Sequence, residues 1–246
     1  MFIVSLPVRS EVMSKLARRI ACVYALLFTL LVWGSWALLV NTREGQFIDD
    51  AAFKGSYWGA ARIDDQARAL LNAVSVPLIV VAIIATLAIA LLRRRPRAAL
   101  WATAVVVGTN VTIQALKHFV FTRPDWGYSQ RVDAANTLPS GHTGVAASIA
   151  VALLLVVPPA WRVIAAWVGA GFTFFMGWST LVCQWHRPSD IIAAAAVAFT
   201  WGFVALAAGA WGTDEYRGLP GSKLARYLLS LGGYLSLALV VMLVSA

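Results

Sequence analysis

Three polar clusters between residues 117 and 190 interrupt an otherwise apolar sequence, and their side chains could bind and cleave a phosphate ester. Each cluster follows or precedes a long apolar run. Together the clusters supply two imidazoles, a carboxylate, two cations and a helix start rich in backbone donors, an inventory that suits a phosphate ester. They are Lys117 with Arg123, then Pro139-Ser140-Gly141-His142, then Ser179-Thr180 followed by His186 and Asp190.

The second cluster reads as the start of a helix. Pro139 cannot continue a helix from upstream, Ser140 is a favoured N-cap, and a long apolar stretch follows. Amides at this positive helix end form a ready anion site, and Gly141 lets an anion approach the backbone without a side chain in the way. The alternative is an ordinary capped helix with His142 on the surface.

In the first cluster, Lys117 ends an apolar run and Arg123 lies just beyond it. The two cations could clamp phosphate oxygens, and an arginine can do so in bidentate fashion. The alternative is that both side chains snorkel to lipid headgroups, as is common at helix ends. His118 points elsewhere on a helix from Lys117, so we interpret it as a packing or interface residue.

In the third cluster, His186 and Asp190 are four residues apart with Pro188 between them at a predicted helix start. At this spacing a carboxylate can hydrogen-bond one ring nitrogen and leave the other aimed at a substrate. That arrangement is the base and orienter pair of nucleophilic catalysis. The alternative is that Asp190 only caps the helix and His186 lies in a polar loop.

The elements that must position these clusters are membrane helices. Of the 246 residues, 60% are hydrophobic and 13% are charged, which is outside the usual range for a soluble domain. Crossing the bilayer takes about 20 apolar residues. We therefore predict an all-α polytopic membrane protein with six spanning helices and a seventh, weaker candidate at 228–244. The six predicted spans are 20–40, 74–92, 98–116, 143–157 (short), 161–182 and 191–211.

These spans divide the chain into three parts. Residues 1–19 form a short, basic and irregular cytoplasmic segment, residues 20–211 the membrane domain, and residues 212–246 a C-terminal segment. The first apolar run is longer than a signal-peptide core and is read as an uncleaved span. Residues 41–73 form the one sizeable outer loop, in which 60–71 are either a short helix on the outer leaflet or a solvated connector.

The positive charge lies on one side of the predicted spans. If the N-terminus is cytoplasmic and all seven runs span, the inner segments hold twelve basic and three acidic residues, which is the whole net charge of +9. This is the positive-inside pattern of a membrane protein, so the charge does not indicate nucleic-acid binding. The run from Arg93 to Arg97 is then a topology anchor, and the three polar clusters lie on the extracytoplasmic side.

The two cysteines lie at opposite membrane faces. Cys22 is at the inner end of the first span and Cys183 near the outer end of the fifth. A disulfide needs Cα atoms about 4.4–6.8 Å apart, so we expect no bond between them. Their spacing does not indicate a metal site either.

The order and spacing of the clusters resemble the type 2 phosphatidic acid phosphatase superfamily, which also includes vanadium haloperoxidases. Its pattern is KxxxxxxRP, PSGH and SRxxxxxHxxxD. The first motif is matched by Lys117, Arg123 and Pro124, and the second by residues 139–142. The third is matched by Ser179, His186 and Asp190, but Thr180 stands where the family has an arginine that binds phosphate. Arg187 and Arg131 are candidates to compensate.

The resemblance implies a two-step phosphoryl transfer without metal or other cofactor. His186 would attack phosphorus, Asp190 would orient its ring, and His142 would serve as general acid and then general base. The phosphate would be held by Lys117, Arg123, Ser140 and Gly141. The implied substrate is a lipid phosphate or diphosphate in the plasma membrane, such as a polyprenyl diphosphate, phosphatidic acid or phosphatidylglycerol phosphate, and the composition suggests a bacterial protein.

Three alternatives stay open at this stage. A phosphotransferase would use the same residues and pass the phosphoryl group to an acceptor other than water. The loss of the arginine at Thr180 is also compatible with a degenerate, non-catalytic phosphate-binding protein. A transporter is disfavoured because the spans contain few charges and no pair of broken helices. The lipid chain length, the choice between mono- and diphosphate, and the oligomeric state do not follow from the sequence.

Overall fold

The computed structural model describes residues 8–56, 65, 67–69, 71–72, 76–128 and 136–211. All regular secondary structure in these residues is helical. The α-helices are α1 (Val8–Gly34), α2 (Arg43–Gly55), α4 (Val76–Leu92), α5 (Pro96–Ala115), α6 (Gly141–Val156), α7 (Arg162–Val182) and α8 (Pro188–Ala207). Shorter turns extend three of them: π-helices η1 (Ser35–Val40) and η2 (Leu116–Val120), and the 3₁₀ turn η3 (Pro159–Trp161).

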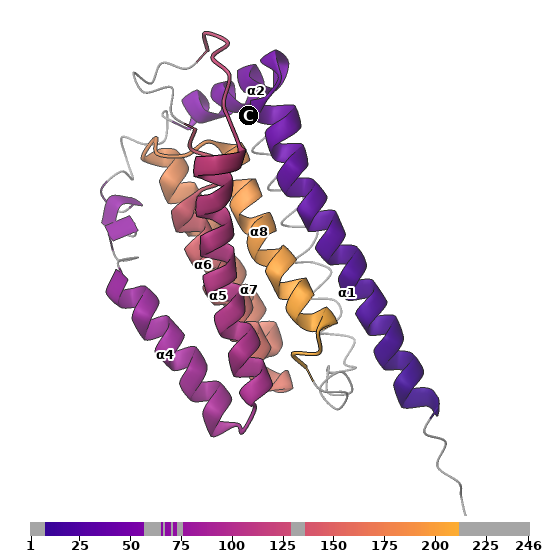
Figure 1. The fold of residues 1–246 in the computed structure, drawn as a ribbon. Helices are drawn as coiled ribbons and strands as arrows, with labels where there is room; N and C mark the ends of the chain where they lie inside the picture. The colour runs from indigo at the N-terminus through magenta and orange to yellow at the C-terminus, as the bar shows by residue number, and fades with distance from the viewer. Residues whose placement is uncertain are drawn as a thin grey trace, which may run out of the picture.

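Helices α5, α6, α7 and α8 run alongside one another as a bundle, with α6 packed against the other three. α1 lies along α8, and α4 lies along α5 (Figure 1). Small residues allow close packing in this bundle: a Cβ at Gly169 of α7 would lie only 2.7 Å from the Cβ of Ala150 in α6. α2 crosses one end of the bundle, whereas the turn between α4 and α5 lies at the other end (Figure 1).

The helices agree with the predicted spans. Four are long and apolar enough to cross a membrane: Lys15–Val40, Pro96–Val120, Pro159–Val182 and Pro188–Ala207. Ile83–Leu92 and Gly141–Val156 are apolar but shorter. Large hydrophobic side chains such as Leu26, Leu30 and Ile84 are exposed on the outer helices, as expected for surfaces that face lipid. The chain is therefore a multi-pass, all-helical membrane protein.

At the end of the bundle opposite α2, arginines bind the C-terminal ends of helices. Arg93 donates to the carbonyl of Val156 at 2.5 Å, and Arg97 donates to the carbonyl of Ala208 at 3.0 Å. Arg162 stacks on Trp211, with its guanidinium carbon 3.7 Å from the ring centroid. Arg93 and Arg97 satisfy carbonyls that α6 and α8 leave unpaired and complement the negative ends of these helices. The predicted anchor residues thus also brace the bundle.

At the ends of the chain, the prediction for the N-terminal segment was wrong, and the C-terminal segment cannot be compared with the structure. The segment 1–19 was expected to be irregular, but α1 begins at Val8, directly after Pro7. No proline or glycine follows Pro7 before the span, so the helix continues outward through the basic residues. The C-terminal segment 212–246, with the weaker candidate span at 228–244, lies outside the described residues. Cys22 and Cys183 are free cysteines, as expected.

The outer loop also differs from its prediction. α2 occupies Arg43–Gly55, a stretch that was expected to be loop. Thr42 caps this helix by accepting a hydrogen bond from the amide of Gly45 at 3.0 Å. In the predicted helix 60–71, residues 65, 67–69 and 71 are helical. Ala67 and Leu71 are buried against Val182 and neighbouring residues, so this part packs on the bundle and is not a solvated connector.

Candidate active site

His186 and Asp190 form a buried pair at the start of α8. The carboxylate atom Oδ2 of Asp190 lies 3.1 Å from Nδ1 of His186 and also accepts hydrogen bonds from the Thr137 hydroxyl at 2.7 Å and the Arg187 amide at 3.1 Å. Asp190 is fully buried and His186 is 9% exposed. Because a carboxylate only accepts hydrogen bonds, Asp190 favours the tautomer with the proton on Nδ1, which leaves the lone pair of Nε2 free.

From the sequence, Asp190 was expected either to cap the helix or to orient the ring of His186, and in the structure it does both. The carboxylate accepts from the Arg187 amide, which is the hydrogen bond of a helix cap, and it also holds the ring of His186. The cap fixes the carboxylate, and the carboxylate fixes the ring. The structural role therefore supports the orienting role instead of replacing it.

The predicted helix start at Ser140 lies directly against this pair. Ser140 is the N-cap of α6 and accepts from the amide of Thr143 at 3.3 Å, while its own amide donates to the carbonyl of Asp190 at 2.9 Å. This last bond ties the start of α6 to the start of α8. A Cβ at Gly141 would meet no atom within 4 Å, so the glycine borders open space. The first amides of α6 therefore point toward an accessible region.

His142 and Lys117 face the same region. The ring of His142 lies beside Trp185, with 5.4 Å between centroids, and it interacts electrostatically with His186 and Lys117. The charge of Lys117 also acts on Asp190. Lys117 lies in η2, and its carbonyl and that of Phe121, the residue that follows η2, accept from the side-chain amide of Asn136. The π-helical turn thus directs a lysine at the end of α5 toward the histidines.

Arg123 lies behind the pair and faces two carboxylates. Its Nη2 atom is 3.6 Å from Oδ1 of Asp190 and 3.7 Å from Oδ2 of Asp49. These distances are ion-pair contacts too long for hydrogen bonds. Burial lowers the pKa of Arg123 and Asp190 opposes that shift, but a guanidinium stays charged at any pH of interest. Nε has no hydrogen-bond partner among the described residues, and Nη2 has only these two ion-pair contacts, so the buried Nε donor is left for a ligand.

Sequence reasoning missed Asp49 and Asp50, two buried aspartates on α2. Asp49 accepts from the amide of Ser189 at 2.9 Å and from its hydroxyl at 2.6 Å, so α2 is joined to the first turn of α8. Asp50 pairs with Lys54 at 2.8 Å and with Arg187 at 3.5 Å. A helix could have been predicted here from Thr42 as an N-cap, Glu44 in the first turn and Lys54 in the last.

Thr180, the departure from the family pattern, is fully buried in the last turn of α7. Its hydroxyl donates to the carbonyl of Gly177 at 2.6 Å, and its carbonyl accepts from the amides of Trp185 and His186. Ser179 is also buried in this turn. Thr180 therefore contributes to the turn that leads to His186 and carries no charge toward the site.

Of the two candidates to compensate for Thr180, Arg187 lies at the site. Its guanidinium is buried, lies 5.1 Å from the ring centroid of Phe53, and interacts electrostatically with Arg123. Arg131 lies outside the described residues. His118, which was set apart from the site, is exposed and pairs with Gln114 at 3.2 Å. Among the described residues, no three His, Cys, Asp or Glu side chains are grouped so as to hold a metal ion.

The protonation of Asp49 makes a prediction for stability. Burial, followed by the charge of Asp190, raises the pKa of Asp49 from 3.8 to about 6, although Ser189 and Arg123 oppose the shift. Between these values only the folded state binds the proton, so the free energy of unfolding falls as pH rises, by up to about 3 kcal/mol in total.

We therefore expect Asp49→Asn to gain stability relative to wild type as pH rises from about 4 to about 7, because the amide never ionises. Thermal unfolding in detergent, followed by tryptophan fluorescence at several pH values, measures the difference. A difference in melting temperature that does not change with pH would contradict a raised pKa of Asp49 near 6.

The site and the fold define a class of protein. Catalytic-type side chains, cations and an open helix N-terminus meet at one end of a bundle of membrane helices, which is the arrangement of a membrane enzyme acting on an anionic group. Residues 71–213, more than half of the chain, match the family model of the PAP2 superfamily. The chain belongs to the PAP2 superfamily, and this membership supports a membrane phosphatase.

A solved structure has the same fold. It is the crystal structure of a transmembrane PAP2-type phosphatidylglycerolphosphate phosphatase from Bacillus subtilis, with a TM-score of 0.56 and 17% sequence identity. The match covers 76% of this chain and 94% of that one. A search of curated protein sequences gives no match. α2, with Asp49 and Asp50, lies outside the residues that match the family model.

Proposed function

We propose that this membrane phosphatase hydrolyses a lipid phosphate or diphosphate through a phosphohistidine on His186. The observation that carries the proposal is the buried contact of 3.1 Å between His186 Nδ1 and Asp190, which leaves Nε2 of a ring that interacts electrostatically with His142 free to react. An oriented imidazole beside cations and free amides is suited to attack phosphorus.

In the first step, the lone pair of Nε2 on His186 attacks phosphorus, an N–P bond forms, and the bond to the leaving oxygen breaks. His142 gives that oxygen its proton. In the second step, His142 removes a proton from water, the hydroxide attacks phosphorus, and the N–P bond breaks to release phosphate. Asp190 stabilises the positive charge that the His186 ring carries in the intermediate.

The equatorial phosphate oxygens would be held by Lys117, Arg123 and the N-terminus of α6 at Ser140 and Gly141. Preorganised charge of this kind supplies most of the catalysis in phosphoryl transfer. The Nε atom of Arg123, which has no hydrogen-bond partner among the described residues, supports this role. Arg187 would add the charge that Thr180 lacks.

The chemistry of the site suggests candidate substrates, and the distribution of arginines suggests the side of the membrane on which the site lies. Candidate substrates are a polyprenyl diphosphate, phosphatidic acid and phosphatidylglycerol phosphate; the last is the substrate class of the structural relative from Bacillus subtilis. The arginines that bind the ends of α6 and α8 lie away from the site, so the positive-inside rule favours an extracytoplasmic site in a plasma membrane.

Phosphate release from a panel of lipid phosphates by the purified protein, in EDTA, tests the proposal. Release from at least one of them supports a phosphatase that needs no metal. Adding candidate acceptors then separates hydrolysis from phosphotransfer, since a transferase moves the phosphoryl group onto the acceptor. No release and no transfer from any member of the panel would contradict both reactions.

Gly141→Ala tests the helix N-terminus as the phosphate site. The new methyl group meets no protein atom within 4 Å, so we expect an unchanged melting temperature. It would displace a bound phosphate, and a displacement of about 1 Å costs on the order of 10²-fold in rate. Steady-state kinetics with a lipid phosphate measures the loss. Gly171→Ala on α7 is the matched control, because its Cβ also meets nothing within 4 Å; an equal loss in both would contradict the assignment.

A further inference from the structure

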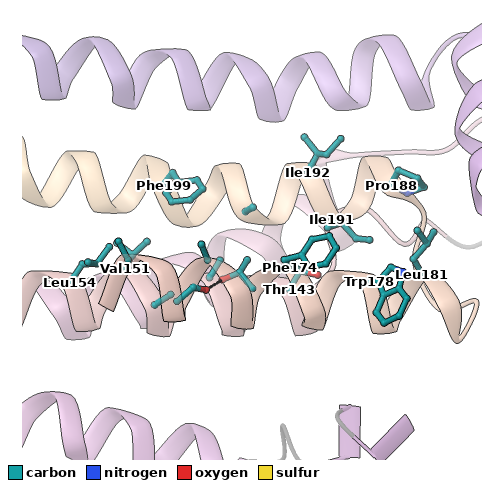
Figure 2. A pocket seen from close by; sticks show the side chains of 17 residues that line it. Thr143, Val151, Leu154, Phe174, Trp178, Leu181, Pro188, Ile191, Ile192 and Phe199 are labelled. Atoms are coloured by element: carbon teal, nitrogen blue, oxygen red, sulfur yellow. Dashed lines mark hydrogen bonds between the residues drawn. The ribbon is translucent and has the colours of Figure 1, made fainter. Parts of the chain in front are cut away.

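A cavity of about 490 Å³ lies between α6, α7 and α8. Figure 2 shows its lining side chains, which extend from Pro188 and Leu181 at one end to Phe199 and Leu154 at the other. α7 and α8 both pack on α6 but make little contact with each other, and the cavity fills the space between them. We call this space the α7–α8 groove.

The groove begins at the candidate active site. Pro188 lies between His186 and Asp190 in the sequence, and Thr143 directly follows His142. Thr143 is fully buried, and its hydroxyl has no hydrogen-bond partner among the described residues. An unpaired buried hydroxyl is costly, which favours a ligand with an oxygen atom at this end.

Beyond Thr143 the lining is apolar and continues through one leaflet. The hydroxyl of Thr173 is already bonded to the carbonyl of Gly169 at 2.8 Å, and the remaining lining residues have no polar side chain apart from Trp178. From Pro188 to Phe199 the groove follows α8 for about 16 Å, given the helical rise. This is about half of the 30 Å hydrocarbon core.

The groove also opens to the surrounding membrane. Phe199, at its inner end, is 39% exposed, and Ala170 on its α7 side is exposed as well. A chain already lying in the bilayer could therefore slide in between α7 and α8 with its polar end toward His186. The size of the cavity is typical of small-molecule sites.

We infer that the α7–α8 groove holds the hydrocarbon chain of the substrate and makes the enzyme selective for chains that reach about the middle of the bilayer. This rests on the proposed phosphatase function for the identity of the head group. The occupant is one chain attached to a phosphate or diphosphate, because Thr143 and Pro188 at one end of the groove adjoin site residues in the sequence and the rest of the lining is apolar. Catalytic efficiency should rise with chain length until the groove is filled.

Ala195→Phe, from the α8 side, and Ala166→Phe, from the α7 side, fill the groove without touching the catalytic groups. Each methylene kept out of an apolar site costs about fourfold in binding. We expect kcat/KM for a long-chain phosphatidic acid to fall at least about tenfold in each variant, with little change for a short-chain phosphatidic acid. Ala88→Phe, at an exposed position of α4, is the matched control and should change neither value.

Binding of a long-chain alkyl phosphonate, which cannot be hydrolysed at its carbon–phosphorus bond, gives a readout independent of turnover. Weaker binding to Ala195→Phe and Ala166→Phe, but not to Ala88→Phe, is expected even if wild type proves inactive. In that case the missing turnover would contradict the proposed reaction, while the binding result would still support the groove as the chain-binding site. Equal losses for long and short chains, or unchanged binding of the long-chain phosphonate in both groove variants, would overturn the inference.

Discussion

Replacing His186 with alanine is expected to lower phosphate release from a lipid phosphate by at least about 10⁴-fold. The variant loses the only group proposed to bond covalently to phosphorus, and residual activity would come from bound water and the remaining cations. Asp190 keeps its hydrogen bonds from Thr137 and the Arg187 amide when the ring is removed, so the fold should persist. The initial rate with the best substrate of the panel measures the effect, and melting temperature reports on folding.

His118→Ala is the matched control because this histidine is exposed and pairs only with Gln114 among the described hydrogen bonds. Trapping with a radiolabelled lipid phosphate separates a nucleophile from a general acid. Wild type and His118→Ala should take up label that is lost in acid, as a phosphohistidine is, and His186→Ala should not. Equal labelling of His186→Ala and wild type would place the nucleophile on another residue.

The contact between His186 and Asp190 could be predicted because it is local. Both residues lie within one turn of a helix start, so their spacing alone sets the geometry, and the observed 3.1 Å contact agrees with that prediction. The start of α6 at Gly141 was predictable for the same reason, since proline and serine act on the adjacent backbone. Four membrane helices were also predictable, because each is a continuous apolar run long enough to cross a bilayer.

Asp49 and Thr137 could not be predicted because their partners are distant in the sequence. Ser189, the partner of Asp49, is 140 residues away, and Asp190, the partner of Thr137, is 53 residues away. Nothing in the sequence near a charged residue of an outer loop indicates whether a partner will bury it. α2 was missed for a related reason: it is amphipathic and too short to span, so a search for membrane helices passes over it.

Arg187→Ala is expected to lower kcat/KM by about 10²- to 10³-fold, the usual cost of removing one fixed donor to a developing charge. Thr180 supplies no cation, whereas Arg187 follows the proposed nucleophile and interacts with Arg123. Arg131→Ala, assayed in parallel, tests the other candidate. Near-normal rates in both variants would show that the site works without a third cation.

A loss in Arg187→Ala could also arise because Asp50, only 5% exposed, is left short of a partner. The double variant Arg187→Ala with Asp50→Asn separates the two causes, since it removes the buried charge together with its cation. If Arg187 acts on phosphate, the double variant stays as slow as the single one. If Arg187 only neutralises Asp50, activity returns toward wild type. Lys54→Ala, which removes the exposed partner of the same carboxylate, should leave the rate within a few-fold of wild type.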